Sequence, residues 1–264
     1  MKVGQIMSKD PVSIREDDHM THARQIMRDN LMRGLPVLDG EQRVVGILND
    51  QDILNIKSSK SNVTVRGYVR EYPAITPDTD ILEAAKQLLD AKQHRAPVIA
   101  STGDRSLVGI VSEVDILRNI EPTKRSPKTV GEIMTTGVRT AYPDESIAKL
   151  WSNMLEWDYT GIPVVSHKGQ AMGIVTRSDI IRSGYIRTAS SNTQGSSTGD
   201  SPKVEKVMST PLYSVSPDTS VSEAIQTVLE RNIGRISVTN DNKLVGIVDR
   251  YDLLKACLKG TGFQ

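Results

Sequence analysis

Four aspartates occupy the same place in four similar stretches of the chain. Each lies six residues after a glycine that interrupts an apolar run, and the four are Asp52, Asp115, Asp179 and Asp252. Three residues before each aspartate comes a second polar residue, in order Asn49, Ser112, Thr176 and Asp249. A carboxylate accepts hydrogen bonds from both hydroxyls of a vicinal diol such as ribose, and a hydroxyl beside free backbone N–H groups can hold a phosphate. The spacing therefore indicates sites for a ligand that carries a ribose and a phosphate.

A purely structural interpretation explains the same spacing. All four polar residues are types favoured at the N-cap of a helix, and an aspartate three positions later suits the positive end of the helix dipole. Capping alone accounts for both positions in any single copy, so the two interpretations stay open. The copies also differ, because the carboxylate of Asp249 would repel a phosphate whereas Asn49 only alters the hydroxyl contact.

Basic side chains precede each site at a second shared place. His94 and Arg95 lie directly before an Ala-Pro-Val string, and the matching places in other copies include Arg33 and Arg235. Two such donors could converge on a di- or triphosphate with charge-assisted hydrogen bonds. We expect this of His94 and Arg95, whereas a solvated surface position is favoured for Arg33. Arg177, in the third copy, is a further donor that could face a phosphate.

The elements that must position these residues form one unit that is repeated four times. In each unit a helical pattern precedes a short strand marked LPV, APV, IPV or ISV, and the glycine-containing strand and a last helix follow. The first helices are predicted to begin at Met20, Ile81, Ile147 and Val221. The unit is β-α-β-β-α, and the fold class is α/β. A unit of about 60 residues is marginal at burying its own faces, so we expect neighbouring repeats to pair into two modules.

Spacing and composition locate the boundaries. We expect a first module over 1–120, with repeats over about 1–57 and 62–120. A second module is expected over 125–264, with repeats over about 127–186 and 202–260. The string EPTKRSPK at 121–128 carries two prolines and is the candidate domain boundary. The stretch 188–201 is rich in Ser, Thr and Gly and predicts a flexible loop.

Composition excludes several classes of protein. Lys plus Arg number 33 against 32 Asp plus Glu, so the formal net charge of +1 supplies no global field that would gather nucleic acid. The single cysteine, Cys257, can form no internal disulfide and no cysteine cluster for zinc, and no metal site is expected. No leader-like start and no run of about 18 apolar residues is present, so we expect a cytoplasmic protein without membrane contact. No P-loop, nucleophile elbow or Cys–His arrangement is present, so the chain is not expected to be an enzyme.

The four copies resemble CBS (cystathionine-β-synthase) domains. The resemblance covers nearly the whole chain and includes the opening strings VGQIM (3–7), VGEIM (130–134) and VEKVM (204–208). It implies two-repeat modules with clefts that bind AMP, ADP or ATP as ligands, with no cofactor. Four repeats without a catalytic domain are similar to the regulatory γ subunit of AMP-activated protein kinase and to stand-alone archaeal proteins. We therefore expect a homodimeric adenine-nucleotide sensor that signals to a regulated protein by rearrangement of its modules.

The resemblance implies unequal sites. The family's ribose and phosphate contacts carry over to four residues of the second and third repeats, Ser112, Asp115, Thr176 and Asp179. His94 and Arg95 resemble the phosphate-contacting His-Arg pair of the kinase γ subunit. An adenine base needs an apolar slot, which Ile14, Ile75 and Val215 could supply, although the three are equally good core residues. In the first and fourth repeats the hydroxyl is replaced, so we expect altered or doubtful sites beside the carboxylates there.

Two alternatives stay open. S-adenosylmethionine or methylthioadenosine would present the ribose diol without a phosphate and would suit the first and fourth repeats better. A structural or nucleic-acid-binding adaptor with empty clefts has slight support from the basic stretch 124–128. The near-neutral charge and the small number of aromatic residues (2 Trp, 7 Tyr and 1 Phe) weigh against nucleic acid.

Overall fold

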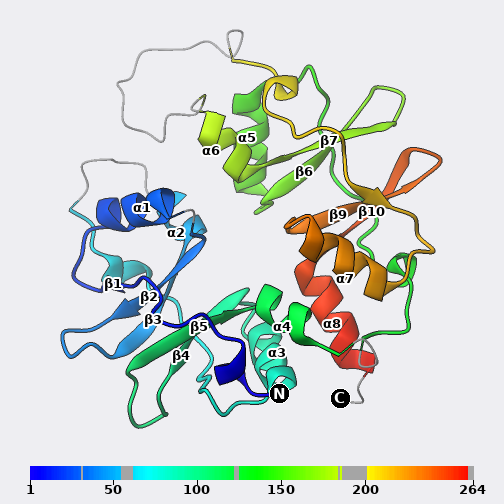
Figure 1. Cartoon of the computed structure of the whole chain (residues 1–264). Coiled ribbons are helices and arrows are strands. Elements are labelled where there is room, and N and C mark those ends of the chain that lie inside the picture. The colour runs from blue at the N-terminus through cyan, green and yellow to red at the C-terminus, as the bar shows by residue number, and fades with distance from the viewer. Residues whose placement is uncertain (31, 55–61, 122–124, 184, 186–200, 261–264) are drawn as a thin grey trace. The chain divides into compact units, whose positions relative to one another are not determined.

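The computed structural model describes residues 1–30, 32–54, 62–121, 125–183, 185 and 201–260 (Figure 1). Contacts within the chain divide it into two compact units: residues 1–126 with the chain from Leu254 onward, and Pro127–Leu253. All but one residue of the expected Ser-rich loop at 188–201 lies outside the described residues, as does the middle of the candidate boundary at 122–124. The expected module limits at 120 and 125 stay a prediction.

Each repeat contains the expected α/β unit (Figure 1). The first has a 3-10 helix at Val3–Gln5, then β1 (Ile14–Arg15), α1 (Met20–Asp29), β2 (Gly34–Leu38), β3 (Val44–Asn49) and α2 (Asp50–Leu54). The second has a 3-10 helix at Val65–Tyr68, then α3 (Ile81–Asp90), β4 (Arg95–Ile99), β5 (Leu107–Ser112) and α4 (Glu113–Asn119). The third has a 3-10 helix at Val130–Glu132, then α5 (Ile147–Glu156), β6 (Gly161–Val165), β7 (Ala171–Thr176) and α6 (Arg177–Ser183). The fourth has a 3-10 helix at Val204–Lys206, then β8 (Ser214–Val215), α7 (Val221–Glu230), β9 (Arg235–Asn240), β10 (Lys243–Asp249) and α8 (Arg250–Gly260).

The first helix of every repeat begins at the residue that the apolar spacing predicts, so this prediction is confirmed. Local sequence sets these starts, since the side chains before α3, α5 and α7 each accept a hydrogen bond from an N–H group of the first turn. These N-cap residues are Asp80, Ser146 and Ser220. The first strand is weaker than predicted in the second and third repeats, where one residue, Ile75 or Ala141, makes a single parallel bridge.

An antiparallel strand pair carries each predicted site, and its register decides which residues meet. The first residue of the earlier strand lies opposite the last residue of the later strand, in the pairs Gly34–Asn49, Arg95–Ser112, Gly161–Thr176 and Arg235–Asp249. The next residue begins the last helix of the repeat, as the N-cap interpretation predicts. The sheet therefore brings Arg95 and Arg235 level with the polar residues of the predicted sites.

The opening segment of each repeat, which is its first 3-10 helix and the few residues after it, packs on the neighbouring repeat of the pair, so neighbouring repeats exchange these segments. Ser8, from the opening of the first repeat, bridges to Ile110 in β5 of the second, and Arg70, from the opening of the second, bridges to Ile47 in β3 of the first. Each bridge consists of two backbone hydrogen bonds of 2.9 to 3.0 Å. The third and fourth repeats make the equivalent bridges Thr135–Ile247 and Ser209–Ile174. The repeats are thus paired as expected, one with two in module 1 and three with four in module 2.

This exchange explains the glycine that recurs in every repeat. A Cβ atom at Gly173 would lie 2.6 Å from the carbonyl oxygen of Ser209, and a Cβ atom at Gly109 would lie 3.0 Å from that of Ser8. The backbone of the opening segment crosses so closely that a side chain has no room. The glycine is therefore a packing requirement of the paired repeats.

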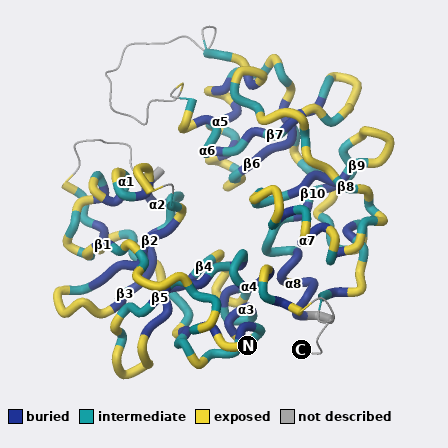
Figure 2. The backbone as a smooth tube through the Cα atoms, viewed as in Figure 1, coloured by how far each residue is buried: buried dark blue, intermediate teal, exposed yellow. Residues whose placement is uncertain are grey.

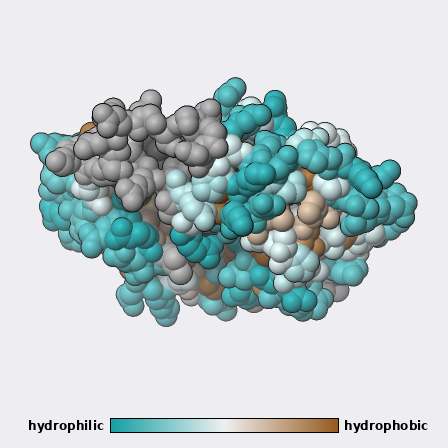
Figure 3. All heavy atoms as spheres, turned by 90° about the horizontal axis from the view of Figure 1, so that it is seen from above, coloured by the Kyte–Doolittle hydropathy of each residue, from teal (hydrophilic) through white to brown (hydrophobic). Residues whose placement is uncertain are grey.

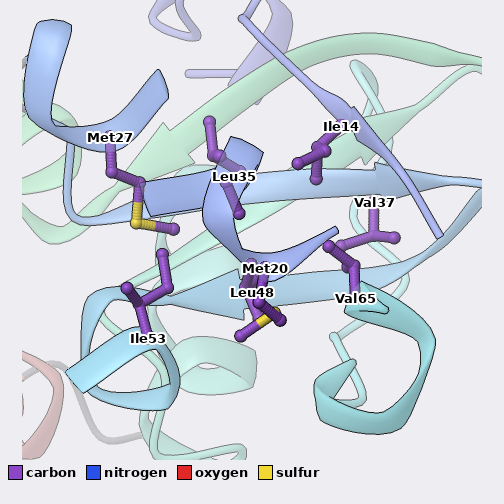
Figure 4. Packing of buried hydrophobic residues seen from close by; sticks show 9 residues of the cluster. Ile14, Met20, Met27, Leu35, Val37, Leu48, Ile53 and Val65 are labelled. Carbon is purple, nitrogen blue, oxygen red and sulfur yellow. The ribbon is translucent and has the colours of Figure 1, made fainter. Parts of the chain in front are cut away.

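Each repeat buries one face of its first helix against its strands (Figure 2). In the first repeat, Met20, Ala23 and Met27 of α1 pack with strand residues despite the two arginines that interrupt the apolar face. Figure 4 shows this cluster, whose labelled members are Ile14, Met20, Met27, Leu35, Val37, Leu48, Ile53 and Val65. Val65 comes from the opening segment of the second repeat, and Val204 of the fourth repeat enters the core of the third in the same way. The cores therefore hold the paired repeats together.

Candidate ligand sites

The second repeat places a hydroxyl and a carboxylate together at the start of α4. The Oγ of Ser112 donates a hydrogen bond of 2.7 Å to Oδ2 of Asp115, and the Ser112 N–H donates to the same oxygen at 2.9 Å. Within the described part of the chain, Oδ1 of Asp115 makes no hydrogen bond or ion pair, and the residue is only half-buried. One carboxylate oxygen is therefore oriented by the fold while the other is available to a ligand hydroxyl.

The third repeat repeats this geometry with one difference. The hydroxyl of Thr176 donates to Oδ2 of Asp179 at 2.6 Å, and the backbone N–H of Thr176 donates to it at 2.9 Å. Oδ1 of Asp179 accepts a hydrogen bond of 3.2 Å from Arg182, whose side chain is 75% exposed. An exposed pair of this kind contributes little stability, so a ligand could displace the Arg182 side chain at low cost.

The structure places Arg177 differently from the expectation that it faces a phosphate. Its side chain is 7% exposed, and Nη2 donates to the carbonyl oxygen of Met154 at 2.7 Å and to Asp158 at 3.2 Å. Met154 lies in the last turn of α5, where carbonyl groups have no partner within the helix. Arg177 therefore holds the end of α5 and is not a phosphate donor in this arrangement.

In the first repeat the predicted ribose carboxylate is already occupied. The side chain of Asp52 is 8% exposed and forms an ion pair with Arg70, whose Nε donates to both oxygens at 2.9 and 3.0 Å. Nη2 of Arg70 adds a third hydrogen bond of 2.6 Å. The side chain of Asn49, which stands in place of the hydroxyl, donates to Gln93 at 3.2 Å. The expected ribose contact of Asp52 is therefore blocked by a side chain of the paired repeat.

The fourth repeat uses two carboxylates to cap α8. The Asp249 N–H donates to Oδ2 of Asp252, and the Asp252 N–H donates to Oδ1 of Asp249, both at 3.0 Å. Asp249 stands where the second and third repeats have a hydroxyl residue. The negative charge of two neighbouring carboxylates opposes the binding of a phosphate at this position.

His94 and Arg95 lie beside the site of the second repeat. Nδ1 of His94 lies 2.9 Å from Oε1 of Glu113, and the imidazole is 68% exposed whereas the carboxylate is 6% exposed. Burial lowers the pKa of the Arg95 guanidinium below its ordinary value, while the nearby charges of Asp50, Glu113 and Asp115 act in the opposite direction. In the strand pair Arg95 lies opposite Ser112, and its side chain approaches Gly34 of the first repeat.

In each module an arginine of the second member crosses to a glycine of the first. A Cβ atom at Gly34 would lie 3.0 Å from Cδ of Arg95, and a Cβ atom at Gly161 would lie 2.8 Å from Nη1 of Arg235. Arg235 also donates to the carbonyl oxygen of Gly161 at 3.1 Å and to the hydroxyl of Thr160. The side chain of Arg235, which belongs to the fourth repeat, therefore packs against the third repeat. Arg33, which precedes Gly34 and matches His94 in position, is exposed.

The three candidate adenine contacts differ in exposure. Ile14 and Ile75 are buried core residues, whereas Val215 is half-buried. Of the three, only Val215 offers side-chain surface to a ligand in this structure.

Sequence reasoning missed Arg70 and Glu113. A signal for Arg70 was present: when the opening of the second repeat, VRGYV at 65–69, is aligned with the other three, the next residue is Arg70 where the others have Ser8, Thr135 or Ser209. Glu113 had no such signal, because its contact with His94 depends on how the strands bring the two residues together.

Comparison with known families identifies the fold. A CBS domain model matches four segments of the chain, at residues 3–59, 65–122, 130–185 and 204–259. The chain belongs to the CBS domain family. The four matched segments are the four repeats, so each repeat is one CBS domain and each module is a CBS pair.

Archaeal relatives match nearly the whole chain. Protein MJ1404 of Methanocaldococcus jannaschii is 30% identical over 262 residues, which cover 96% of this chain but only 61% of that protein. MJ1225 of the same organism is 23% identical over 277 residues, which cover 97% of each chain. The crystal structure of MJ1225, described as a proposed archaeal homologue of the γ subunit of AMP-activated protein kinase, matches with a TM-score of 0.77 at 22% identity and covers 97% of this chain and 99% of its own. A conserved protein from Pyrococcus horikoshii matches with a TM-score of 0.70 at 21% identity, covering 97% and 100%. Both structures show the same fold.

Among the described residues, no helix is long and apolar enough to cross a membrane. Most of the residues coloured by hydropathy on the face in Figure 3 are hydrophilic. Over the part of the chain that the structure describes, no three His, Cys, Asp or Glu side chains gather in a way that could hold a metal ion.

Proposed function

We propose that this chain is a non-catalytic regulatory protein that binds adenine nucleotides at the second and third CBS domains. The observation that carries the proposal is the half-buried carboxylate of Asp115, which is oriented by Ser112 and keeps Oδ1 available. The likeness in fold to MJ1225, described as a proposed homologue of a kinase γ subunit, supports the same proposal. We place the protein in the cytoplasm.

The chemistry of the second domain suits a nucleoside phosphate. Oδ1 of Asp115 would accept hydrogen bonds from the ribose hydroxyls, and the half-buried Arg95 lies opposite Ser112 in the strand pair. Arg95 would pair with a phosphate through charge-assisted hydrogen bonds, and the exposed imidazole of His94 would add a donor. Glu113 positions the imidazole of His94 through Nδ1.

Ligand binding would act by population shift. A nucleotide moves the equilibrium between two arrangements of the protein only as far as its affinities for the two arrangements differ. Because each CBS pair exchanges its opening segments, a ligand beside Asp115 contacts residues of one domain while it changes the surroundings of the other. This change would alter the packing of a homodimer and its contact with a regulated partner protein.

Titration calorimetry tests the proposal. We expect AMP, ADP or ATP to bind the full chain, and Asp115→Asn to weaken binding at one site at least about tenfold, since a hydrogen bond to a charged group contributes about 1.5 to 3 kcal/mol. Asp78→Asn is the matched control, because Asp78 is exposed and lies outside the sites. The proposal is refuted if no adenine nucleotide binds at millimolar concentration.

S-adenosylmethionine or methylthioadenosine is a second candidate ligand, and the fourth domain favours it. Its two carboxylates, Asp249 and Asp252, oppose a phosphate but suit an uncharged or cationic adenosine derivative. Arg95→Ala should abolish nucleotide binding in module 1 while methylthioadenosine binding is retained. Equal loss of both ligands would argue against separate sites for the two classes.

A further inference from the structure

The ion pair between Asp52 and Arg70 satisfies every acceptor that a ribose would use in the first CBS domain. Arg70 donates three hydrogen bonds of 2.6 to 3.0 Å to the two carboxylate oxygens, and the Asn49 N–H donates a fourth of 3.0 Å. The carboxylate is almost fully buried beneath these donors. A guanidinium edge and a vicinal diol both present two adjacent donors, so they compete for the same carboxylate.

The exchange of opening segments places Arg70 there. Its backbone bridges to Ile47, the residue after the fixed glycine of β3. The three equivalent bridges carry other residues at the place of Arg70: Ser8 opposite Ile110 in the second domain, Ser209 opposite Ile174 in the third and Thr135 opposite Ile247 in the fourth. These short, uncharged side chains cannot form a bidentate ion pair with a carboxylate. The identity of one opening residue therefore distinguishes the first domain from the other three.

We propose that Arg70 closes the first CBS domain to adenosine ligands by occupying Asp52 in place of the ribose. The residue at this opening position is then a specificity-determining residue, which decides whether the partner domain of the pair can bind a diol. This inference rests on the proposed function, because it concerns which of the four domains take the adenosine ligand.

A matched pair of variants tests the proposal in the full chain by titration calorimetry with AMP. Asp52 and Asp115 occupy equivalent positions in module 1 and receive the same change to asparagine. We expect Asp115→Asn to lower the number of AMP molecules bound per chain by one and Asp52→Asn to leave it unchanged. A loss of one site in Asp52→Asn overturns the proposal, because it would mean that the wild-type first domain binds AMP.

Two substitutions at the opening position test whether this residue causes the difference between the first and second domains. Arg70→Ser should add one AMP site per chain, and Ser8→Arg should remove the site at Asp115 by forming the ion pair that Arg70 forms in the first domain. Ser8→Ala is the control for the latter and should bind AMP as the wild type does. If Arg70→Ser does not fold, Ser8→Arg alone decides, since Ser8 is exposed and bridges through its backbone. Unchanged binding in Ser8→Arg, or no added site in a folded Arg70→Ser, overturns the proposal.

The outcomes separate this proposal from the proposed function. Absence of AMP binding in the wild type and in every variant refutes both. Binding in the wild type together with failure of the opening-residue exchanges refutes the role of Arg70 and leaves the nucleotide sensor standing.

Discussion

Replacement of Gly173 by alanine should loosen module 2, because this glycine lies where the opening segment of the fourth domain crosses β7. The added methyl group would lie 2.6 Å from the carbonyl oxygen of Ser209 and 3.1 Å from Cγ2 of Thr210. To avoid this clash the opening segment must move away from the strand. The two backbone hydrogen bonds between Ile174 and Ser209, of 3.1 and 2.8 Å, are then lost.

The expected cost follows from these bonds. Each contributes about 0.5 to 1.5 kcal/mol, so their loss costs roughly 2 kcal/mol. Alanine also lowers the conformational entropy of the unfolded chain, which stabilises the folded state by about 0.4 to 1 kcal/mol and offsets part of this cost. The free energy of unfolding should therefore fall by about 1 to 2 kcal/mol, which corresponds to a decrease in Tm of roughly 2 to 8 °C for a unit of this size.

Tryptophan fluorescence during urea unfolding measures this change. Both tryptophans, Trp151 and Trp157, pack against the core of the third domain, so the signal reports on module 2. Gly40→Ala is the control, because a Cβ atom at Gly40 would meet no atom within 4 Å. Unfolding of Gly173→Ala at the same urea concentration as the wild type and the control would refute the reasoning that a side chain at this position forces the opening segment away from β7.

Two further predictions concern buried side chains. Val65→Ala should lower the free energy of unfolding by about 2 kcal/mol, because Val65 is fully buried in the core of the paired domain. Urea unfolding followed by circular dichroism measures this change. The control Val12→Ala, at an exposed valine, should change the free energy of unfolding by less than about 0.5 kcal/mol. Cys257 is fully buried, and burial raises the pKa of its thiol, so at pH 8 the native chain should react with a disulfide reagent much more slowly than the urea-unfolded chain. The raised pKa also means that the folded state keeps this proton when the unfolded state loses it, so this contribution to stability is full below about pH 8.5 and is lost as the pH rises through the folded pKa. Fast labelling of the native chain would show that the thiol is accessible.

The fold could be predicted from the sequence because its signals are local and occur four times. Helix starts depend on apolar spacing and on an N-cap residue one position away, and both can be seen in the sequence. The strand ends at Ser112 and Thr176 were predicted for the same reason, since an N-cap and its aspartate lie three residues apart. Repetition removed the ambiguity that any single copy would have had.

The partners of the charged side chains could not be predicted, because they lie far away along the chain. Arg70 reaches Asp52 across 18 residues, Arg177 reaches Met154 across 23, and Arg235 reaches Gly161 across 74. A sequence pattern gives the position of a long side chain on its element but does not give the direction in which it extends. Arg177 illustrates this, since its place beside an N-cap suggested a phosphate donor, whereas in the structure its side chain donates to the carbonyl oxygen of Met154 at the end of α5.

In every pair the opening segment of one CBS domain bridges to the strand that leads to the candidate site of the other. In the first domain the carboxylate and its N-cap partner belong to that domain, whereas Arg70, which occupies the carboxylate, comes from the opening of the second. A substitution in one domain can therefore open or close the site of its neighbour without changing any residue of the site itself. Arg70 and Ser8 stand in this relation to Asp52 and Asp115. Four domains of one fold can in this way acquire different ligand affinities through single side-chain changes at the opening position, whose backbone bonds to the sheet stay the same.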